Sequence, residues 1–217
     1  VQKSCFYADC LKAKVFLPVY RTSYRHKFPT PVEDCYGAAE WIASHAGELQ
    51  ANREKLVVYG ESAGGCLAAA VALMARDRKA FPISFQMLIY PVTDIRQEGE
   101  SLKTYKDGNW SAAANRQMWP LYLGVKEPEN IGYASPLRAD SLADLPPAYV
   151  EPQEYDCLRD EAVTYAKRLG AAGVPVILNL IEGSYHAFDE EYPNPFVVSV
   201  LRHRMDVLRN YFDIPNE

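Results

Sequence analysis

Short apolar runs alternate with segments of helical periodicity along most of the chain. The apolar runs predict strands over residues 13–20, 56–59, 85–92, 148–150 and 174–181. Apolar residues at helical spacing predict helices over residues 31–46, 65–78, 159–172 and 195–212. Strands that alternate with helices predict an α/β fold, a mostly parallel sheet with helices on both faces. Ligands bind such sheets at the carboxyl ends of the strands.

The alternation is interrupted between residues 95 and 134 by short pieces rich in aromatic residues. Trp110, Trp119 and Tyr122 are among them. Aromatic side chains on irregular segments outside an α/β alternation are typical of a cap over a pocket. The other interpretation is that they pack the cap against its own core. We expect one domain over residues 1–217, with residues 95–134 as a cap-like insertion.

The turn between the second predicted strand and the next helix has the sequence Gly-Glu-Ser-Ala-Gly at residues 60–64. A Gly-x-Ser-x-Gly pattern in this context is typical of a nucleophile elbow, in which small neighbours allow a strained serine conformation. We expect Ser62 to be the nucleophile and the N–H of Ala63 to donate to an oxyanion. A glycine-rich turn without chemistry is the alternative. A phosphate loop is disfavoured because no Gly-Lys-Ser/Thr follows.

Composition and charge argue against several classes of binding partner. Apolar residues make up 48% of the chain and aromatic residues 12%, as in ordinary globular proteins. A net charge of -5 provides no basic face, so nucleic acid is not an expected partner. No apolar run has the length of a membrane span and no signal-like leader opens the chain, so we expect no membrane partner and a cytoplasmic location. The five scattered cysteines predict neither disulfides nor a zinc site, and no cofactor is expected.

A serine nucleophile needs a base, and the base needs an acid that orients it. Of the four histidines, only His186 follows a predicted strand directly, in a loop at its carboxyl end. Among the acidic residues after the 148–150 strand, Asp156 lies between strand and helix. Asp160 and Glu161 instead fit the first turn of that helix, where they complement the dipole. The chain order Ser62, Asp156, His186 is that of α/β-hydrolases.

Several separate motifs between residue 15 and the C-terminus resemble the hormone-sensitive-lipase-like branch of the α/β-hydrolases, the bacterial carboxylesterase family. They are Tyr20-Arg21, Phe28-Pro29, Val32-Glu33-Asp34, Gly60-Glu61-Ser62-Ala63-Gly64-Gly65, Ser135-Pro136-Leu137, Asp156-Cys157-Leu158-Arg159-Asp160-Glu161 and His186-Ala187-Phe188. The resemblance implies an α/β-hydrolase fold with Ser62 as nucleophile, Asp156 as acid and His186 as base. The departures from the family pattern include Glu61 for Asp, Cys157 for Pro and Ala187 for Gly.

One family motif is missing from the sequence. Family members carry a His-Gly-Gly-Gly loop upstream of the elbow, and its backbone N–H groups supply most of the oxyanion hole. No such sequence precedes Ser62. The resemblance therefore implies an N-terminally shortened chain, in which the predicted strand over residues 13–20 either pairs with the elbow strand directly or leaves a gap in the sheet.

These observations predict a serine carboxylesterase that hydrolyses small to medium acyl esters through an acyl-enzyme. The residues expected in the substrate pocket are Glu61, Trp110, Trp119, Tyr122 and Tyr185. The alternatives are an amidase, formamidase or peptidase on the same triad, or a non-catalytic ligand-binding member or inactive fragment, because the oxyanion-hole loop is missing. An unpaired sheet edge would also favour a homodimer.

Overall fold

A computed structural model describes residues 2–125 and 128–215, and these residues form two compact units. Residues Pro18–Ala187 make up the larger unit. The smaller unit consists of the described residues of Val1–Leu17 and Phe188–Glu217. The sheet and all the predicted catalytic residues belong to the larger unit.

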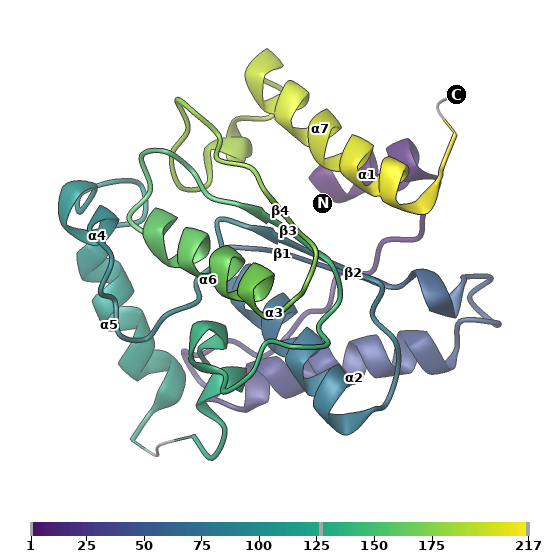
Figure 1. Cartoon of the computed structure of the whole chain (residues 1–217), viewed down its shortest axis with the longest axis horizontal. Helices are drawn as coiled ribbons and strands as arrows, with labels where there is room; N and C mark the ends of the chain where they lie inside the picture. The colour runs from purple at the N-terminus through teal and green to yellow at the C-terminus, as the bar shows by residue number, and fades with distance from the viewer. Residues whose placement is uncertain (1, 126–127, 216–217) are drawn as a thin grey trace. The chain divides into compact units, whose positions relative to one another are not determined.

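The larger unit is built on a sheet of four parallel strands in the order β1-β2-β3-β4 (Figure 1). Its strands are β1 (Val57–Glu61), β2 (Phe85–Ile89), β3 (Ala148–Glu151) and β4 (Val176–Leu178). Neighbouring strands pair in parallel throughout, with Gly60 opposite Leu88 and Leu88 opposite Val150. The predicted parallel α/β sheet is therefore confirmed. The carboxyl ends of all four strands lie at the same end of the sheet, which brings the loops after β1, β2 and β3 together.

Helices of the larger unit cover the sheet and extend beside it. The α-helices are α2 (Thr30–Ser44), α3 (Ala63–Arg78), α4 (Ser101–Thr104), α5 (Ala112–Leu123) and α6 (Arg159–Ala171), with short 3-10 turns η1 (Arg53–Lys55), η2 (Ile131–Tyr133) and η3 (Pro136–Arg138). Side chains of α3 and α6 share one buried cluster with Leu88 and Val150, so both helices pack on the same face of the sheet. α3 is buried from Gly65 to Ala75, because its small residues let it approach the strands closely.

The predicted strand over residues 13–20 does not form. These residues have no regular secondary structure, and the side chains of Val15, Leu17 and Val19 are exposed. An apolar run becomes a strand only where a neighbour takes up its backbone hydrogen bonds. In the described sheet β1 is an edge strand whose one strand neighbour is β2, so the sequence pattern lacks the partner that it requires.

Two other predicted strands are shorter than the apolar runs suggest. The run over residues 85–92 forms strand only to Ile89, because Tyr90 has a positive φ of 34° and Pro91 follows it. The run over residues 174–181 forms strand only from Val176 to Leu178. Beyond β4, an isolated parallel bridge joins Ile181 to Gln153, which follows β3.

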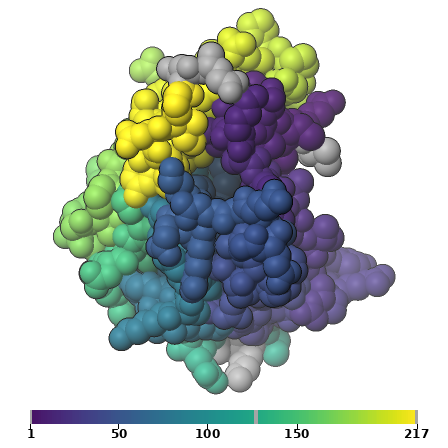
Figure 2. Space-filling model, turned by 90° about the vertical axis from the view of Figure 1, so that its right-hand side faces the viewer, coloured from purple at the N-terminus to yellow at the C-terminus, as the bar shows by residue number. Residues whose placement is uncertain are grey.

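The smaller unit consists of α1 (Gln2–Leu11), the 3-10 turn η4 (Phe188–Glu191) and α7 (Pro195–Phe212). Figure 2 shows α1 and the last turns of α7 side by side. A fully buried ion pair between Arg204 and Asp189, at 2.8 Å, joins α7 to η4. Arg204 also donates to the hydroxyl of Tyr7, and Lys3 reaches Asp189 at 3.2 Å, so charged groups hold the unit together.

Candidate active site

Ser62 occupies a sharp turn between β1 and α3. Its backbone has φ 56° and ψ -120°, a conformation that non-glycine residues adopt only under strain. A Cβ at Gly60 would collide with the backbone of Gly64, and one at Gly65 would lie 2.8 Å from the Cβ of Pro91. The glycines are therefore required for the close passage of strand, helix and the loop after β2. The turn places the Ser62 side chain at the carboxyl end of the sheet.

Ser62, His186 and Asp156 form a continuous chain of hydrogen bonds. The Oγ of Ser62 lies 2.9 Å from Nε2 of His186, and Nδ1 of His186 lies 2.7 Å from Oδ2 of Asp156. His186 and Asp156 are both buried, with 6% and 1% of their surface exposed. This geometry lets a neutral imidazole donate from Nδ1 to the carboxylate while Nε2 accepts the serine proton. The structure thus brings together three residues that lie far apart in the sequence.

Asp156 is held from the start of α6. The backbone N–H of Leu158 donates to Oδ1 of Asp156 at 2.9 Å, and the N–H of Arg159 donates to its carbonyl oxygen. Because one carboxylate oxygen is engaged by the backbone, the other stays directed at the imidazole. The loop between β3 and α6 therefore fixes the orientation of the acid before any substrate binds.

Hydrogen bonds hold the loop that carries His186 in place. Ser184 bonds both to the side chain of Gln153 and to the carbonyl oxygen of Ile181, each at 2.5 Å. The side-chain amide of Asn109 donates to the carbonyl oxygen of His186 at 2.9 Å. The ring of Tyr90 packs against the imidazole, with centroids 4.9 Å apart. Contacts from several loops thus restrict the motion of His186.

Two buried cysteines near the site do not compete as nucleophiles. Burial raises the pKa of Cys157 to about 12, and burial also raises the pKa of Cys66 well above its ordinary value. Both side chains donate to backbone carbonyl oxygens, Cys157 to Trp110 and Cys66 to Ala134. Both are therefore thiols at neutral pH, and a thiol is a much weaker nucleophile than a thiolate.

The predicted pocket residues lie in different surroundings. Trp110 is partly exposed, with its ring centroid 6.1 Å from that of His186. Glu61 is partly buried and accepts from the hydroxyl of Tyr59 at 2.7 Å, and Tyr185 is partly buried one residue before the base. Trp119 and Tyr122, by contrast, are buried in the hydrophobic cluster around α2, α3 and α5.

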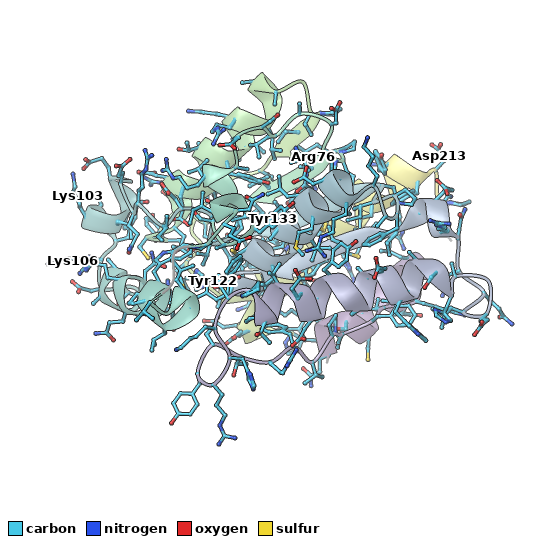
Figure 3. All side chains as sticks on the ribbon, turned by 90° about the horizontal axis from the view of Figure 1, so that it is seen from below. Arg76, Lys103, Lys106, Tyr122, Tyr133 and Asp213 are labelled. Carbon is cyan, nitrogen blue, oxygen red and sulfur yellow. The ribbon has the colours of Figure 1, made fainter. Side chains whose placement is uncertain are left out.

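Figure 3 shows this inner position of Tyr122, whereas Lys103 and Lys106 lie at the periphery. The placement favours a core role for Trp119 and Tyr122. Trp110 is the predicted aromatic residue that contacts the imidazole.

The predicted oxyanion donor, Ala63, is the first residue of α3. Its N–H lies in the first helical turn, where backbone N–H groups have no intrahelical acceptor. The N–H groups of Gly65 and Cys66 are engaged, because both donate to the carbonyl oxygen of Ser62. The helix start therefore supplies a donor next to the serine together with the positive end of the helix dipole.

Residues 2–125 and 128–215 contain no group of three or more His, Cys, Asp or Glu side chains that is arranged to hold a metal ion. No helix in the same ranges combines the length and the apolar character that a membrane crossing requires.

Sequence reasoning missed the burial of Glu161. We assigned this residue to the helix dipole, yet its side chain is buried and its Oε1 accepts from the N–H groups of Thr93 and Asp94. A signal was present, because Glu161 shares the buried face of α6 with Ala162, Tyr165 and Leu169, at helical spacing. It also missed Asn109 and Tyr90, which contact His186 from loops without a recognisable pattern.

The chain is similar to a known protein family and to several proteins that are named esterases. A family model described as alpha/beta hydrolase fold matches residues 5–190. The chain is 38% identical to Esterase LipI of Mycobacterium tuberculosis, over 78% of the chain and 53% of LipI. It is 35% identical to an arylesterase of Saccharolobus solfataricus, over 78% of the chain and 56% of that enzyme.

Among solved structures, a bacterial heroin esterase matches with a TM-score of 0.84 and 36% identity. This match covers 88% of the chain and 62% of that structure. The chain spans about half the length of the curated relatives that it matches.

Proposed function

The chain belongs to the alpha/beta hydrolase fold family, within its hormone-sensitive-lipase-like branch, and on this basis we propose that it is a serine carboxylesterase. The observation that carries the proposal is the hydrogen-bond chain from Ser62 through His186 to Asp156. The relatives support it, because their names describe esterases.

In the proposed reaction the Oγ of Ser62 attacks the ester carbonyl while His186 takes the proton of the serine hydroxyl. Asp156 stabilises the imidazolium that forms and keeps Nδ1 protonated. The imidazolium then gives its proton to the leaving alcohol, which departs as the acyl-enzyme forms. Water, deprotonated by His186, attacks the acyl group and releases the acid, and Ser62 recovers its proton.

The tetrahedral intermediates carry a negative charge on the former carbonyl oxygen. We assign the N–H of Ala63 as one donor to it, at the start of α3. The sequence contains no His-Gly-Gly-Gly motif before the elbow. Because removing a single oxyanion donor typically costs about 10²–10³ in rate, we expect these 217 residues to turn over ester slowly.

The proposed substrates are uncharged esters with small or medium acyl groups. Trp110 offers an apolar ring beside His186, with Glu61 and Tyr185 near the elbow and the base. Trp119 and Tyr122 are buried in the hydrophobic cluster around α2, α3 and α5, so we propose that they support the fold and do not contact the substrate directly. No cofactor takes part in the proposed reaction.

The proposed location is the cytoplasm, and the proposed assembly is a homodimer. All five cysteines are free thiols, which suits a reducing compartment. β1 has one strand neighbour in the described sheet, and such edges favour association between copies of a chain. Sedimentation of the purified protein measures this directly, and a monomer at micromolar concentration would contradict the dimer.

The test of the esterase function compares wild type with Ser62→Ala on p-nitrophenyl acetate and butyrate. We expect turnover by wild type alone, and labelling of Ser62 alone by a fluorophosphonate probe. Equal rates for the two proteins would reject the assignment, and an unlabelled Ser62 in the folded chain would favour a ligand-binding protein. Faster cleavage of a matched p-nitroanilide than of the ester would instead support an amidase.

A further inference from the structure

The loop that follows β2 touches the catalytic residues although it contributes none of them. The backbone N–H of Val92 donates to the carbonyl oxygen of Ser62 at 3.2 Å, and Pro91 packs against Gly65. The preceding Tyr90 packs its ring against His186. We refer to residues 91–95 as the β2 loop. A displacement of this loop would move the nucleophile relative to its base.

Glu161 binds the β2 loop from α6. Its Oε1 accepts from the N–H of Thr93 at 2.6 Å and from the N–H of Asp94 at 3.3 Å. The side chain is buried, on the first turn of the helix that begins just after Asp156. One carboxyl group thus joins the segment that carries the acid to the loop that supports the nucleophile.

We propose that Glu161 is a positioning residue, which holds the β2 loop in the place where Ser62 meets His186. The proposal rests on the esterase function proposed above. Glu161 itself contacts none of the three catalytic side chains in a hydrogen bond that the structure describes. It holds the backbone N–H groups of Thr93 and Asp94. The neighbouring residue Val92 in turn donates its N–H to the carbonyl oxygen of Ser62.

A second set of contacts holds the β2 loop from the side of η3. The Oγ of Ser135 accepts from the N–H of Ile95 at 3.0 Å and donates to the carbonyl oxygen of Thr93 at 2.9 Å. Arg138 bonds the carboxylate of Asp94 at 2.6 Å. Because this side is held independently, loss of Glu161 should shift the loop locally without unfolding the sheet.

The charges around Glu161 distinguish it from an ordinary helix-capping carboxylate. Among the described residues, the titratable and charged groups that interact electrostatically with Glu161 are Asp94, Asp156, Arg138, Cys66 and Cys157. Burial is the main cause that raises the pKa of Glu161 to about 8, and the two carboxylates act in the same direction. The carboxyl is therefore neutral at neutral pH, and ionisation at alkaline pH places a third negative charge beside Asp94 and Asp156.

Three variants separate positioning from stability. Glu161→Leu removes the acceptor and leaves two buried N–H groups unpaired, whereas Glu161→Gln keeps a carbonyl acceptor and abolishes ionisation. Leu169→Ala is the matched control, because Leu169 is fully buried on the same face of α6, two turns further along. All four proteins are compared at a temperature at which each is folded, by kcat and KM on p-nitrophenyl butyrate between pH 6 and pH 9.5.

We expect Glu161→Leu to lower kcat about 10- to 100-fold with KM changed less than about threefold, the size of effect that a small displacement of reacting groups produces. Glu161→Gln should restore kcat to within about threefold of wild type. We expect the activity of wild type to fall above about pH 8, where Glu161 ionises beside Asp94 and Asp156, and Glu161→Gln should lack this fall. Leu169→Ala should lower the melting temperature and leave kcat within about twofold of wild type.

Amide hydrogen exchange gives a readout that does not depend on catalysis. Exchange of residues 92–95 should rise about tenfold or more in Glu161→Leu but not in Glu161→Gln, while β2 stays protected in both. If wild type fails to turn over ester and Ser62 is not labelled, the esterase function is rejected, and the exchange measurement still tests the contact of Glu161 with the loop.

Two results overturn the positioning role if Glu161→Leu folds. One is an equal kcat for Glu161→Leu and Leu169→Ala at equal loss of melting temperature. The other is unchanged exchange of residues 92–95 in Glu161→Leu. If Glu161→Leu does not fold, the pH profile of Glu161→Gln decides, and a profile identical to that of wild type rejects the proposal.

Discussion

Two buried carboxylates of this protein face partners of different kinds. In the larger unit Asp156 lies 2.7 Å from His186, whose neutral imidazole has one ring nitrogen that donates a proton and one that accepts. In the smaller unit Asp189 lies 2.8 Å from Arg204, which keeps its charge at any pH that a protein meets. The first pair includes a group that can take up a proton and release it, whereas the second can only attract. The partner of a buried acid, and not its burial, therefore decides whether the pair can take part in chemistry or only in stability.

The largest expected effect is on the first pair. Asp156→Asn should lower kcat on p-nitrophenyl butyrate about 10³- to 10⁴-fold, because the amide favours the wrong imidazole tautomer. The melting temperature should change little. Asp189→Asn is the matched control, and it should leave kcat within about threefold of wild type at a temperature at which it is folded. A loss of kcat below about tenfold for Asp156→Asn would contradict the proposed role of the acid.

The second pair should respond in stability. Arg204→Met leaves Asp189 charged and buried, which costs about 3–5 kcal/mol in such cases. Lys3, at 3.2 Å from Asp189, offsets part of this loss. Urea unfolding of Arg204→Met and of the double variant Arg204→Met/Asp189→Leu measures it, and the double variant should recover much of the stability. Equal unfolding midpoints for wild type and Arg204→Met would refute the prediction.

Glu161 differs from both acids, because it is a buried carboxyl to which no Lys or Arg side chain bonds in the described structure. Its pKa rises from 4.5 to about 8 on folding. The folded protein therefore holds this proton more tightly than the unfolded chain does, so its contribution to stability is complete below about pH 4.5 and is lost as the pH rises through about 8. Glu161→Gln should lack this dependence. Melting temperatures of both proteins between pH 5 and pH 9 check it, and parallel curves would contradict it.

A substitution at an exposed residue away from the buried charges should change the stability least. Val19 is fully exposed on the segment that was predicted to be a strand. Val19→Ser should change the free energy of unfolding by no more than about 0.5 kcal/mol, as is usual for exposed positions away from special contacts. Val32→Ser, at a fully buried position in α2, is the contrasting control and should destabilise the protein clearly. A large loss for Val19→Ser would show that residues 13–20 pack against a partner in solution.

The parallel α/β sheet, and the three residues that meet at the carboxyl ends of its strands, could be predicted from the sequence alone. This was possible because the relevant signals are local: an apolar run, a turn of small residues around Ser62, and polar loops that begin where predicted strands end. Asp156 and His186 could be chosen because the carboxyl ends of parallel strands share one edge.

The positions of residues without a clear local pattern depend on their tertiary neighbours. Residues 13–20 have the composition of a strand, but a strand exists only with a neighbour, and its presence cannot be read from the segment itself. Trp110 and Trp119 are equally aromatic, yet one lies beside His186 and the other is buried in a core cluster. Glu161 satisfies the rule for a first-turn acid and still turns inward, because two backbone N–H groups of a distant loop need an acceptor there.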